Sequence, residues 1–190
     1  MKSTGVVRRI DELGRIVVPK EIRRTLRIRE GDSLEISSYD DAIVLKKHSL
    51  VESVDNFITQ YVNAVHMSSK KEIIVTDMEK VVALSNGFKK SFLGKKINIR
   101  IDDMIQKRST QLVERGNNIE ICEGLTLNEA IVLRPISVYG DLIGAVIVIG
   151  DNFVGDTEKM LAELTALFVG KYLESWGYFL GFYLLFSLIL

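Results

Sequence analysis

The stretch LGRIVVPKEIRRTL, residues 13–26, is the most informative part of the sequence for the fold of the N-terminal part of the chain. It overlaps the turn signal DELG (11–14), which follows GVVRRI (5–10). GVVRRI and RIVV (15–18) both mix β-branched with basic residues, so together with the turn they predict a β-hairpin. Pro19 ends the second strand, because proline cannot donate to a ladder, and it suits the start of a helix.

A short helix and a second hairpin are expected next. The apolar spacing predicts a helix over about Lys20–Leu26. SLEISS (33–38) and AIVLKK (42–47) alternate around the turn signal YDD, which predicts two paired strands. Residues 1–48 are therefore expected to form one small domain of two hairpins and a helix.

Charge is distributed unevenly along the chain. In total, 25 basic and 25 acidic residues cancel. Residues 1–29 nevertheless hold nine basic and three acidic side chains, a net of +6, whereas residues 48–190 hold 14 and 17, a net of −3. This asymmetry indicates a polyanion partner for the N-terminal part, and double-stranded DNA fits because Lys and Arg neutralise its phosphates.

The N-terminal domain is too small to stand alone. About fifty residues bury little core, and domains of this size commonly depend on oligomerisation. Two copies with two hairpins each would close a shared sheet without exposed edges, and would double the basic surface. We therefore expect a homodimer.

The same residues carry a family resemblance. Residues 2–47 closely resemble the AbrB-type swapped-hairpin DNA-binding domain, and LGRIVVPKEIRRTL is the most specific part. The resemblance implies an intertwined dimeric β-barrel in which the hairpins of two chains interleave. It also implies which side chains contact DNA: Arg8, Arg15, Arg23 and Arg24, with Arg9 and Lys2 as phosphate contacts beside them.

The alternative role of each arginine is that of a solvated surface charge. The density of basic residues before residue 30 favours DNA contact. For Arg27 and Arg29 both alternatives stay open, because these side chains could pair with Glu30 and Asp32.

The remaining chain predicts a second domain of mixed helices and strands. SLVESVDNFITQYVNAV (49–65) has one apolar stripe at helical spacing, which serves either the domain core or a contact between two chains. The pattern predicts strands over 72–77, 80–85, 118–124, 129–138 and 139–151, a turn or helix over 87–93, and helices over 101–109 and 156–174. The large apolar residues of the last helix are expected to face inward: Met160, Leu161, Leu164, Leu167, Phe168 and Tyr172.

This order of elements resembles a GAF-type sensor domain, although PAS-like domains share much of it. RPI (134–136) followed by GDLIGAVIVIG (140–150) and a long helix is typical of the GAF fold. The expected fold class is α+β: an AbrB-like head (1–48), a linker or first sensor helix (49–70) and a GAF-like body (71–174). The combination resembles sporulation regulators.

The implied function is sequence-specific transcription regulation of sporulation genes, as activator or repressor. The body would support oligomerisation, as a homodimer or homotetramer, or sense an unidentified small-molecule effector. Fold analogy places an effector pocket near Asp77, Arg134 and residues 97–104. The alternative is an antitoxin-type autoregulator that neutralises a toxin partner. The long, ordered-looking body disfavours this alternative, because antitoxins usually carry a short acidic tail.

Catalytic motifs are missing from the sequence. It contains no HExxH, P-loop, GxGxxG or nucleophile elbow. Cys122 is the only cysteine, which excludes an intrachain disulfide and a cysteine metal cluster, and its strand position predicts a core residue. We therefore expect a regulator without catalytic residues, metal or cofactor. Its cysteine usage and polar N-terminus predict a cytoplasmic, nucleoid-associated protein.

The tail WGYFLGFYLLFSLIL (176–190) carries no charge. Three interpretations remain open: a membrane anchor, an interface or buried helix, and an end without a selected role. Counted from Ser175, the apolar run has sixteen residues, which is marginally short of the roughly 20 that a spanning helix needs. Membrane contact through this tail is therefore one of three hypotheses.

Overall fold

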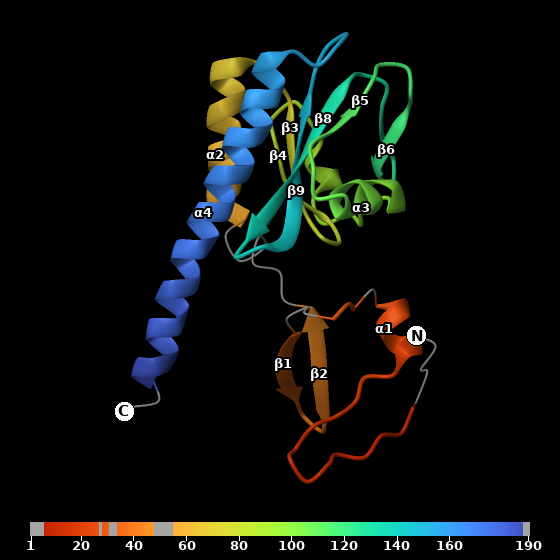
Figure 1. Ribbon diagram of the computed structural model, residues 1–190, viewed down its shortest axis with the longest axis vertical. Helices are drawn as coiled ribbons and strands as arrows, with labels where there is room; N and C mark the ends of the chain where they lie inside the picture. The colour runs from red at the N-terminus through yellow and green to blue at the C-terminus, as the bar shows by residue number, and fades with distance from the viewer. Residues whose placement is uncertain (1–5, 27, 31–33, 48–54, 188–190) are drawn as a thin grey trace. The chain divides into compact units, whose positions relative to one another are not determined.

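The computed structural model describes residues 6–26, 28–30, 34–47 and 55–187 (Figure 1); the side chains of Lys47, Asp55 and 176–187 are outside that description. The chain divides into two compact units, residues 1–48 and residues 49–190, called here the head and the body. Each unit is described by itself.

The head contains one helix and one hairpin. Helix α1 (Lys20–Thr25) follows Pro19. Strands β1 (Leu34–Tyr39) and β2 (Ala42–Lys47) pair antiparallel around a two-residue turn in which Asp40 has a φ of 44°. Positive φ at such a turn matches the right-handed twist of the flanking strands. The predictions of a short helix and a second hairpin are thus confirmed.

The first predicted hairpin is only half formed within one chain. Its turn exists: the Gly14 amide donates to the Asp11 carbonyl at 2.9 Å, and the Asp11 amide donates to the Arg15 carbonyl at 3.1 Å. Residues 6–18 form no strand, however, so the prediction of two ladder-forming strands is wrong for the single chain. A strand needs a partner for its N–H and C=O groups, and the described part of the head supplies none.

The described head has almost no core of its own. Among the described residues, every buried hydrophobic side chain apart from Pro19 belongs to the body. The head instead exposes large apolar residues, including Val7 at 92% and Val17 at 75% in the first segment and Ile36 at 71% in β1. The single chain therefore leaves unused the hydrophobic surface that would hold a head together.

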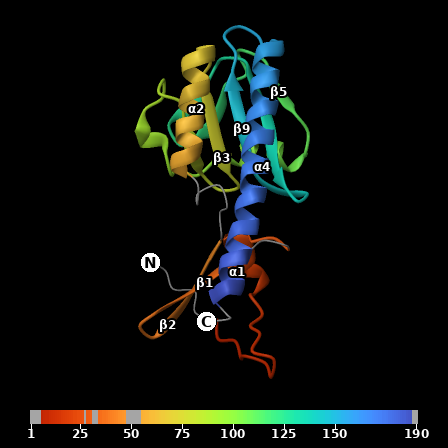
Figure 2. The same cartoon turned by 90° about the vertical axis from the view of Figure 1, so that its left-hand side faces the viewer.

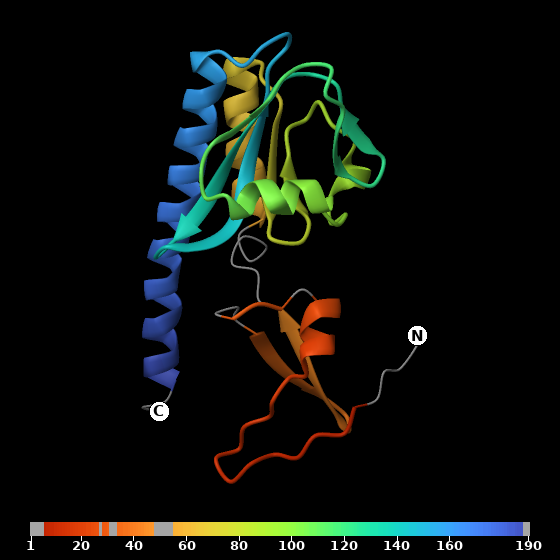
Figure 3. The same ribbon diagram turned by 45° about the vertical axis from the view of Figure 1, so that its right-hand side comes forward.

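A five-stranded antiparallel sheet forms the centre of the body, with the strand order β4-β3-β9-β8-β5. Its strands are β3 (Ile73–Asp77), β4 (Val81–Leu84), β5 (Gln111–Val113), β8 (Ile131–Val138) and β9 (Asp141–Ile149). Helices α2 (Asp55–Ser69) and α4 (Asp156–Ser187) cover one face (Figure 2). Helix α3 (Ile99–Gln106) and the hairpin of β6 (Ile119–Cys122) and β7 (Leu125–Leu127) cover the other (Figure 3). A short 3-10 helix, η2 (Lys90–Phe92), precedes α3.

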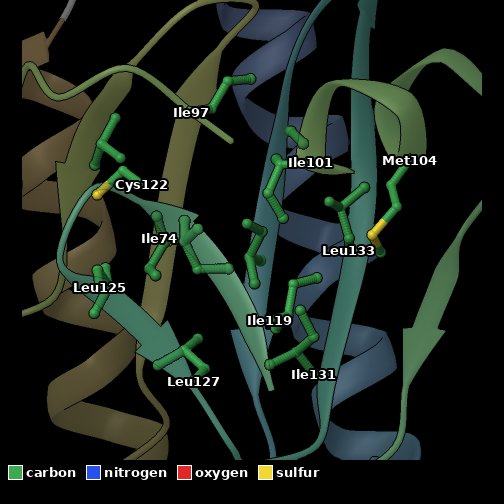
Figure 4. Close-up of a cluster of buried hydrophobic side chains, with 14 of the residues drawn as sticks. Ile74, Ile97, Ile101, Met104, Ile119, Cys122, Leu125, Leu127, Ile131 and Leu133 are labelled. Carbon is green, nitrogen blue, oxygen red and sulfur yellow. The ribbon is translucent and has the colours of Figure 1, made fainter. Parts of the chain in front are cut away.

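Alternation along the strands builds two separate cores. On β3, Ile73 and Val75 face α2 and α4, while Ile74 faces the other side. The second core brings Ile101 and Met104 of α3 over the sheet and the β6–β7 hairpin (Figure 4). Strand β9 lies between both cores, which explains its continuous apolar run.

Several elements of the body differ from the sequence-based expectation. Strands β5 and β7 were not predicted, because three residues are too few to show an alternating pattern. Helix α3 begins at Ile99 rather than at residue 101, since the Asn98 side chain caps it by accepting the Arg100 amide at 3.0 Å.

Helix α4 continues without interruption to Ser187 rather than ending near Glu174, so the backbone of most of the tail is helical. In the part of the chain that the structure describes, no helix combines the length and hydropathy that crossing a bilayer requires.

The inward face of α4 also differs from the prediction. Met160, Leu164 and Leu167 are 60%, 54% and 55% exposed. Leu161 does face the sheet and Tyr172 packs against the same core, as predicted, and the rest of the buried face carries Ala162, Ala166, Val169 and Leu173. Apolar residues lie on more than one side of this helix, so periodicity alone could not choose the buried face. The buried face combines Ala162 and Ala166 with the larger Leu161, Val169 and Leu173.

Helix α2 belongs to the body core. Ile58 and Val62 are fully buried against the sheet, which settles the role of this part of its apolar stripe. Leu50 and Val54 of the same predicted stripe lie outside the described residues. Aromatic stacking ties α2 to α4, with Phe57 4.0 Å from Tyr172 and Tyr61 4.4 Å from Phe168 between ring centroids.

Candidate DNA-binding surface

The predicted DNA contacts lie on three short pieces of the head. Arg8 and Arg9 precede the turn at residues 11–14, and Arg15 follows it directly. Arg23 and Arg24 occupy the last turn of α1. All five side chains are exposed, and Lys2 lies outside the described residues. Within one chain these pieces supply separate basic groups, not one assembled site.

Four of these arginines offer unoccupied guanidinium groups. The side chains of Arg8, Arg9, Arg23 and Arg24 make no hydrogen bond or ion pair within the described residues. The positions of Arg23 and Arg24 at the C-terminal end of α1 are electrostatically favourable, because cations there complement the helix dipole. An exposed arginine without a partner can present its donors bidentately to phosphate or guanine.

Arg15 differs because Asp11 holds it. One carboxylate oxygen of Asp11 accepts the amides of Leu13 at 3.0 Å and Arg15 at 2.8 Å. The other accepts Nε of Arg15 at 2.7 Å. The bond uses only Nε, and the Arg15 side chain remains 70% exposed, so the outer edge of the guanidinium stays available.

Asp11 holds a residue of the predicted site, and the sequence reasoning missed this contact. The backbone and side-chain hydrogen bonds from Arg15 lower the pKa of Asp11, which keeps the carboxylate charged. The DELGR pattern contained the signal, since an aspartate that opens a turn commonly accepts amides from the next residues.

The effector pocket predicted in the body is not assembled. Arg134 lies on the α4 side, where it donates to Thr110 Oγ1 at 2.9 Å and lies 3.8 Å from Glu163. Ile101 and Met104 are packed into the core on the opposite face of the sheet. Because the sheet separates these groups, the predicted combination is wrong.

The Asp77 side chain, which was predicted near an effector pocket, stabilises a turn. Its side chain accepts the amides of Glu79 at 2.6 Å and Lys80 at 2.7 Å, and so closes the β3–β4 turn.

A recess of about 200 Å³ does lie between β8 and α4. It is lined by Arg134, Pro135, Ser137, Ala166, Leu167, Gly170, Lys171 and Glu174.

Cys122 is a core residue, as predicted. It is fully buried in the second core, and burial raises the pKa of its thiol. Such a thiol is a poor nucleophile, because the reactive form is the thiolate. Over the ranges that the structure describes, no group of three His, Cys, Asp or Glu residues gathers into a metal-binding set.

Comparison with known proteins matches both units. Residues 53–174 match the family model of the stage V sporulation protein T C-terminal region, described as a transcription factor. Residues 7–52 match the model of the bacterial antitoxin MazE, described as antidote-toxin recognition. Stage V sporulation protein T of Bacillus subtilis (strain 168) is 37% identical over 177 residues, which cover 92% of this chain and 99% of that protein.

Further similarities concern single units. The transition state regulatory protein AbrB of the same strain is 62% identical over 48 residues, or 25% of this chain and 50% of AbrB. The solution structure of the AbrB N-domain is 61% identical, covering 26% of this chain and 94% of that chain with a TM-score of 0.25. The cofactor-binding GAF domain of the nutrient sensor CodY from Clostridium difficile is 18% identical, covering 80% and 92%, with a TM-score of 0.43.

An AbrB-type head followed by an α/β body defines the class of protein as a transcription regulator. Within that class, the chain belongs to the stage V sporulation protein T family. The predicted fold class and family resemblance are confirmed.

Proposed function

We propose that this protein regulates sporulation genes by binding double-stranded DNA through a homodimer of its heads. The observation that carries the proposal is the head itself, which exposes both its apolar side chains and its arginines. A small unit with this composition gains a core only by association. Association then gathers two sets of basic groups on one surface.

The second copy would supply what the first hairpin lacks. Residues 6–10 and 15–18 mix β-branched and basic side chains, but they form no ladder in one chain. Pairing with the same segment of another copy would satisfy the strand edges and bury the apolar face. This is the swapped arrangement that the AbrB resemblance implies.

DNA binding is assigned to Arg8, Arg15, Arg23 and Arg24, with Arg9 and Lys2 on phosphates. Arg15 is pre-positioned by Asp11, so less side-chain freedom is lost when it contacts DNA. Arginine forks contact phosphate or guanine edges, while DNA shape and deformability add selectivity at positions without contact. The protein would accordingly reside on the nucleoid, in the cytoplasm.

The body is assigned to oligomerisation and to effector sensing, and no chemical step is assigned to it. Met160, Leu164 and Leu167 form an exposed apolar stripe along α4. Pairing of this stripe between bodies would join two head dimers into a homotetramer. Light scattering of the full chain, compared with the L164E/L167E variant, tests this: the parent should be tetrameric and the variant dimeric.

The recess between β8 and α4 is the place proposed for a small effector. Its lining combines the cations Arg134 and Lys171 with the carboxylate of Glu174. A thermal-shift screen of polar metabolites should find a compound that stabilises the parent but not the R134A variant. Equal stabilisation of both would contradict this location.

The DNA-binding assignment is tested with the double variant R8A/R15A. Its matched control is K20A/K46A, which also removes two exposed head charges but no assigned contact. Binding is measured by fluorescence anisotropy on duplexes identified by genome-wide mapping in sporulating cells. R8A/R15A should lose at least a hundredfold in affinity, since two arginine contacts at about 1–3 kcal/mol each are removed from every head. Equal losses in both variants would contradict the assignment.

A toxin-neutralising autoregulator is the second candidate, favoured by the match of residues 7–52 to an antitoxin model. The match of residues 53–174 to a transcription-factor family favours the first candidate. Purification of the full chain from its native cells separates the two, because an antitoxin would copurify with a toxin in fixed stoichiometry.

A further inference from the structure

One segment of the body has the opposite charge from its surroundings. Residues 80–101 carry six basic side chains and no acidic one. The rest of residues 48–190 carries eight basic and seventeen acidic side chains, a net of −9. The weakly negative total of the body therefore conceals a strongly basic segment on an acidic domain.

The structure holds this segment along the edge of the central sheet. After β4, the chain turns through η2 and returns beside β4, so that Lys80 and Lys96 are bridge partners. Backbone bonds fix the return: Gly94 donates to Val81 at 2.8 Å, Val81 to Lys95 at 2.9 Å, and Ile97 to Glu79 at 2.8 Å. The basic side chains thus project from an ordered backbone.

Four of the six cations are available to a partner. Lys89, Lys90, Lys96 and Arg100 are exposed, and they make no side-chain hydrogen bond or ion pair within the residues described. These four residues are called the body patch. Lys95 is different, because its ammonium donates to the Glu123 carbonyl at 2.9 Å and lies 5.4 Å from the Phe92 ring.

We propose that the body patch is a second DNA-binding surface that contacts phosphates outside the site held by the heads. The inference rests on the proposed function, since the heads must first bring the body to DNA. Tethering raises the local concentration of DNA phosphates near the patch, so that weak contacts become effective. The acidic remainder of the body would then orient this edge, and no other, toward the duplex.

The chemistry of the patch favours DNA over an acidic protein. Three of its four side chains are lysines, which suit phosphates as point charges. Protein interfaces usually add aromatic or aliphatic anchors at their centre. In this segment the only large apolar side chains with substantial exposure are Leu93 at 39% and Ile99 at 56%.

The salt dependence of DNA binding tests the inference on the full chain. The variant K89Q/K90Q/K96Q/R100Q removes the patch. Its control, K70Q/K107Q/R115Q/K159Q, removes three lysines and one arginine from exposed positions elsewhere in the body. The dissociation constant is measured against salt concentration on a duplex that extends well beyond the heads' site on both sides.

The patch variant should bind at least tenfold more weakly at low salt than the control. Its slope of log affinity against log salt should be shallower by up to about 3.6 per chain, since each of the four phosphate contacts contributes roughly 0.9. The milder variant K90Q/R100Q should show about half of that change and guards against a folding defect in the fourfold variant. On a duplex trimmed to the heads' site, patch and control variants should bind alike.

Two results would overturn the inference. If both variants match in slope and affinity on the long duplex while the parent binds DNA, the patch does not contact DNA and the proposed function stands. If DNA binding is unchanged but transcription in a purified system falls only for the patch variant, the patch serves a protein partner. Failure of the parent itself to bind any mapped duplex would instead overturn the proposed function together with this inference.

Discussion

The head and the body use hydrophobic residues in opposite ways. In the body, alternating strands place fully buried isoleucine, leucine and valine side chains in two cores on either side of one sheet. In the described head, comparable residues such as Val17 and Ile36 are 75% and 71% exposed. The body forms two hydrophobic cores within one chain, whereas the described head has apolar side chains that remain exposed.

This difference relates to how each unit works. The head carries a net charge of +6 over residues 1–29, and a monomeric head would have to form a core beside that charge. A dimeric head can bury its apolar face between copies and leave the arginines outside. If the heads pair as proposed, DNA binding would be coupled to association, because the dimer would bring two sets of basic side chains onto one surface.

The largest effect is expected from a charge placed on the exposed apolar residues of the head, because this tests whether a dimer buries them. Ile16 and Val17 are exposed neighbours, at 47% and 75%, and in a strand they would face opposite sides. If the dimer buries one of them, aspartate there should cost more than about 4 kcal/mol, since an unpaired buried charge is among the largest single-mutation effects. One of I16D and V17D should therefore lose both dimerisation of the heads and DNA binding.

Sedimentation and DNA anisotropy measure these losses, and circular dichroism verifies that the body stays folded. The less affected of the two variants is the control for the other. If both variants dimerise and bind DNA like the parent, neither side of residues 15–18 lies in an interface, and the comparison between head and body fails.

A core deletion in the body should produce the next largest effect. Ile147 on β9 is fully buried, and Leu112 on β5 of the same sheet is 54% exposed. I147A should destabilise the body by about 2–5 kcal/mol, because truncation leaves a cavity that the sheet cannot close. L112A should change stability by less than about 1 kcal/mol.

Thermal unfolding of the full chain gives both values. DNA affinity of I147A, measured well below its melting temperature, should remain near that of the parent, because the head does not depend on this core. A loss of DNA affinity parallel to the loss of body stability would show that the two units are not independent.

A smaller effect is expected at the ion cluster that ties α4 to the sheet. Lys71 contacts Glu158 at 2.9 Å and Asp151 at 3.0 Å, and Glu158 also accepts the Gly155 amide at 2.8 Å. Burial opposes ionisation of Glu158, but the hydrogen bonds from Lys71 and from the backbone outweigh it and lower the pKa. K71M should cost about 2 kcal/mol, between the values for exposed and buried pairs.

The pH dependence follows from the lowered pKa of Glu158. Its contribution to stability is present above the ordinary pKa of 4.5 and is lost as the pH falls through the lower pKa of the folded state. The parent should therefore lose body stability below about pH 4.5 more steeply than K71M. Parallel melting curves of the parent and K71M across this range would contradict the assignment.

The smallest effect is expected at the turn of the head. D11N keeps an acceptor for the amides of Leu13 and Arg15 but removes the charge beside the Arg15 guanidinium. The head gains one positive charge, so DNA binding should tighten about twofold at low salt, and the gain should vanish at high salt. E12Q makes the same charge change at an exposed neighbour without a contact to Arg15.

Anisotropy titrations at two salt concentrations compare the variants. If Asp11 positions Arg15 for DNA, D11N should also reduce discrimination between specific and unrelated duplexes, and E12Q should not. Identical discrimination in D11N and E12Q would mean that Asp11 only closes the turn.

Sequence patterns predicted local elements well wherever neighbours along the chain decide them. Helix α1 after Pro19, the β1–β2 hairpin and the continuous apolar strand β9 all follow from spacing and turn signals. The basic head and its exposed arginines follow from composition. The prediction of Cys122 as a core residue rested on its strand position, and burial confirms it.

Other features depended on contacts between distant parts of the chain. The buried face of α4 could not be predicted from periodicity, because this helix carries apolar residues on its exposed side as well. The prediction of one effector pocket was wrong because Arg134 and residues 101–104, which the fold analogy places together, lie on opposite faces of the sheet. The contact of Asp11 with the Arg15 side chain and the edge location of the body patch depend on hydrogen bonds and bridge partners that the structure provides.

The positions of apolar and basic residues are given directly by the sequence, and the turns can be predicted because they depend on a few consecutive residues. The sequence therefore predicted a basic head that is too small to bury much core and a body of mixed helices and strands. Only the tertiary structure decided which faces are buried and which charges are brought together, because burial and proximity depend on pairings between segments far apart in the chain. The first hairpin depends on pairing in this way: its residues are β-branched and basic like those of a strand, yet residues 6–18 form no strand within the described part of one chain.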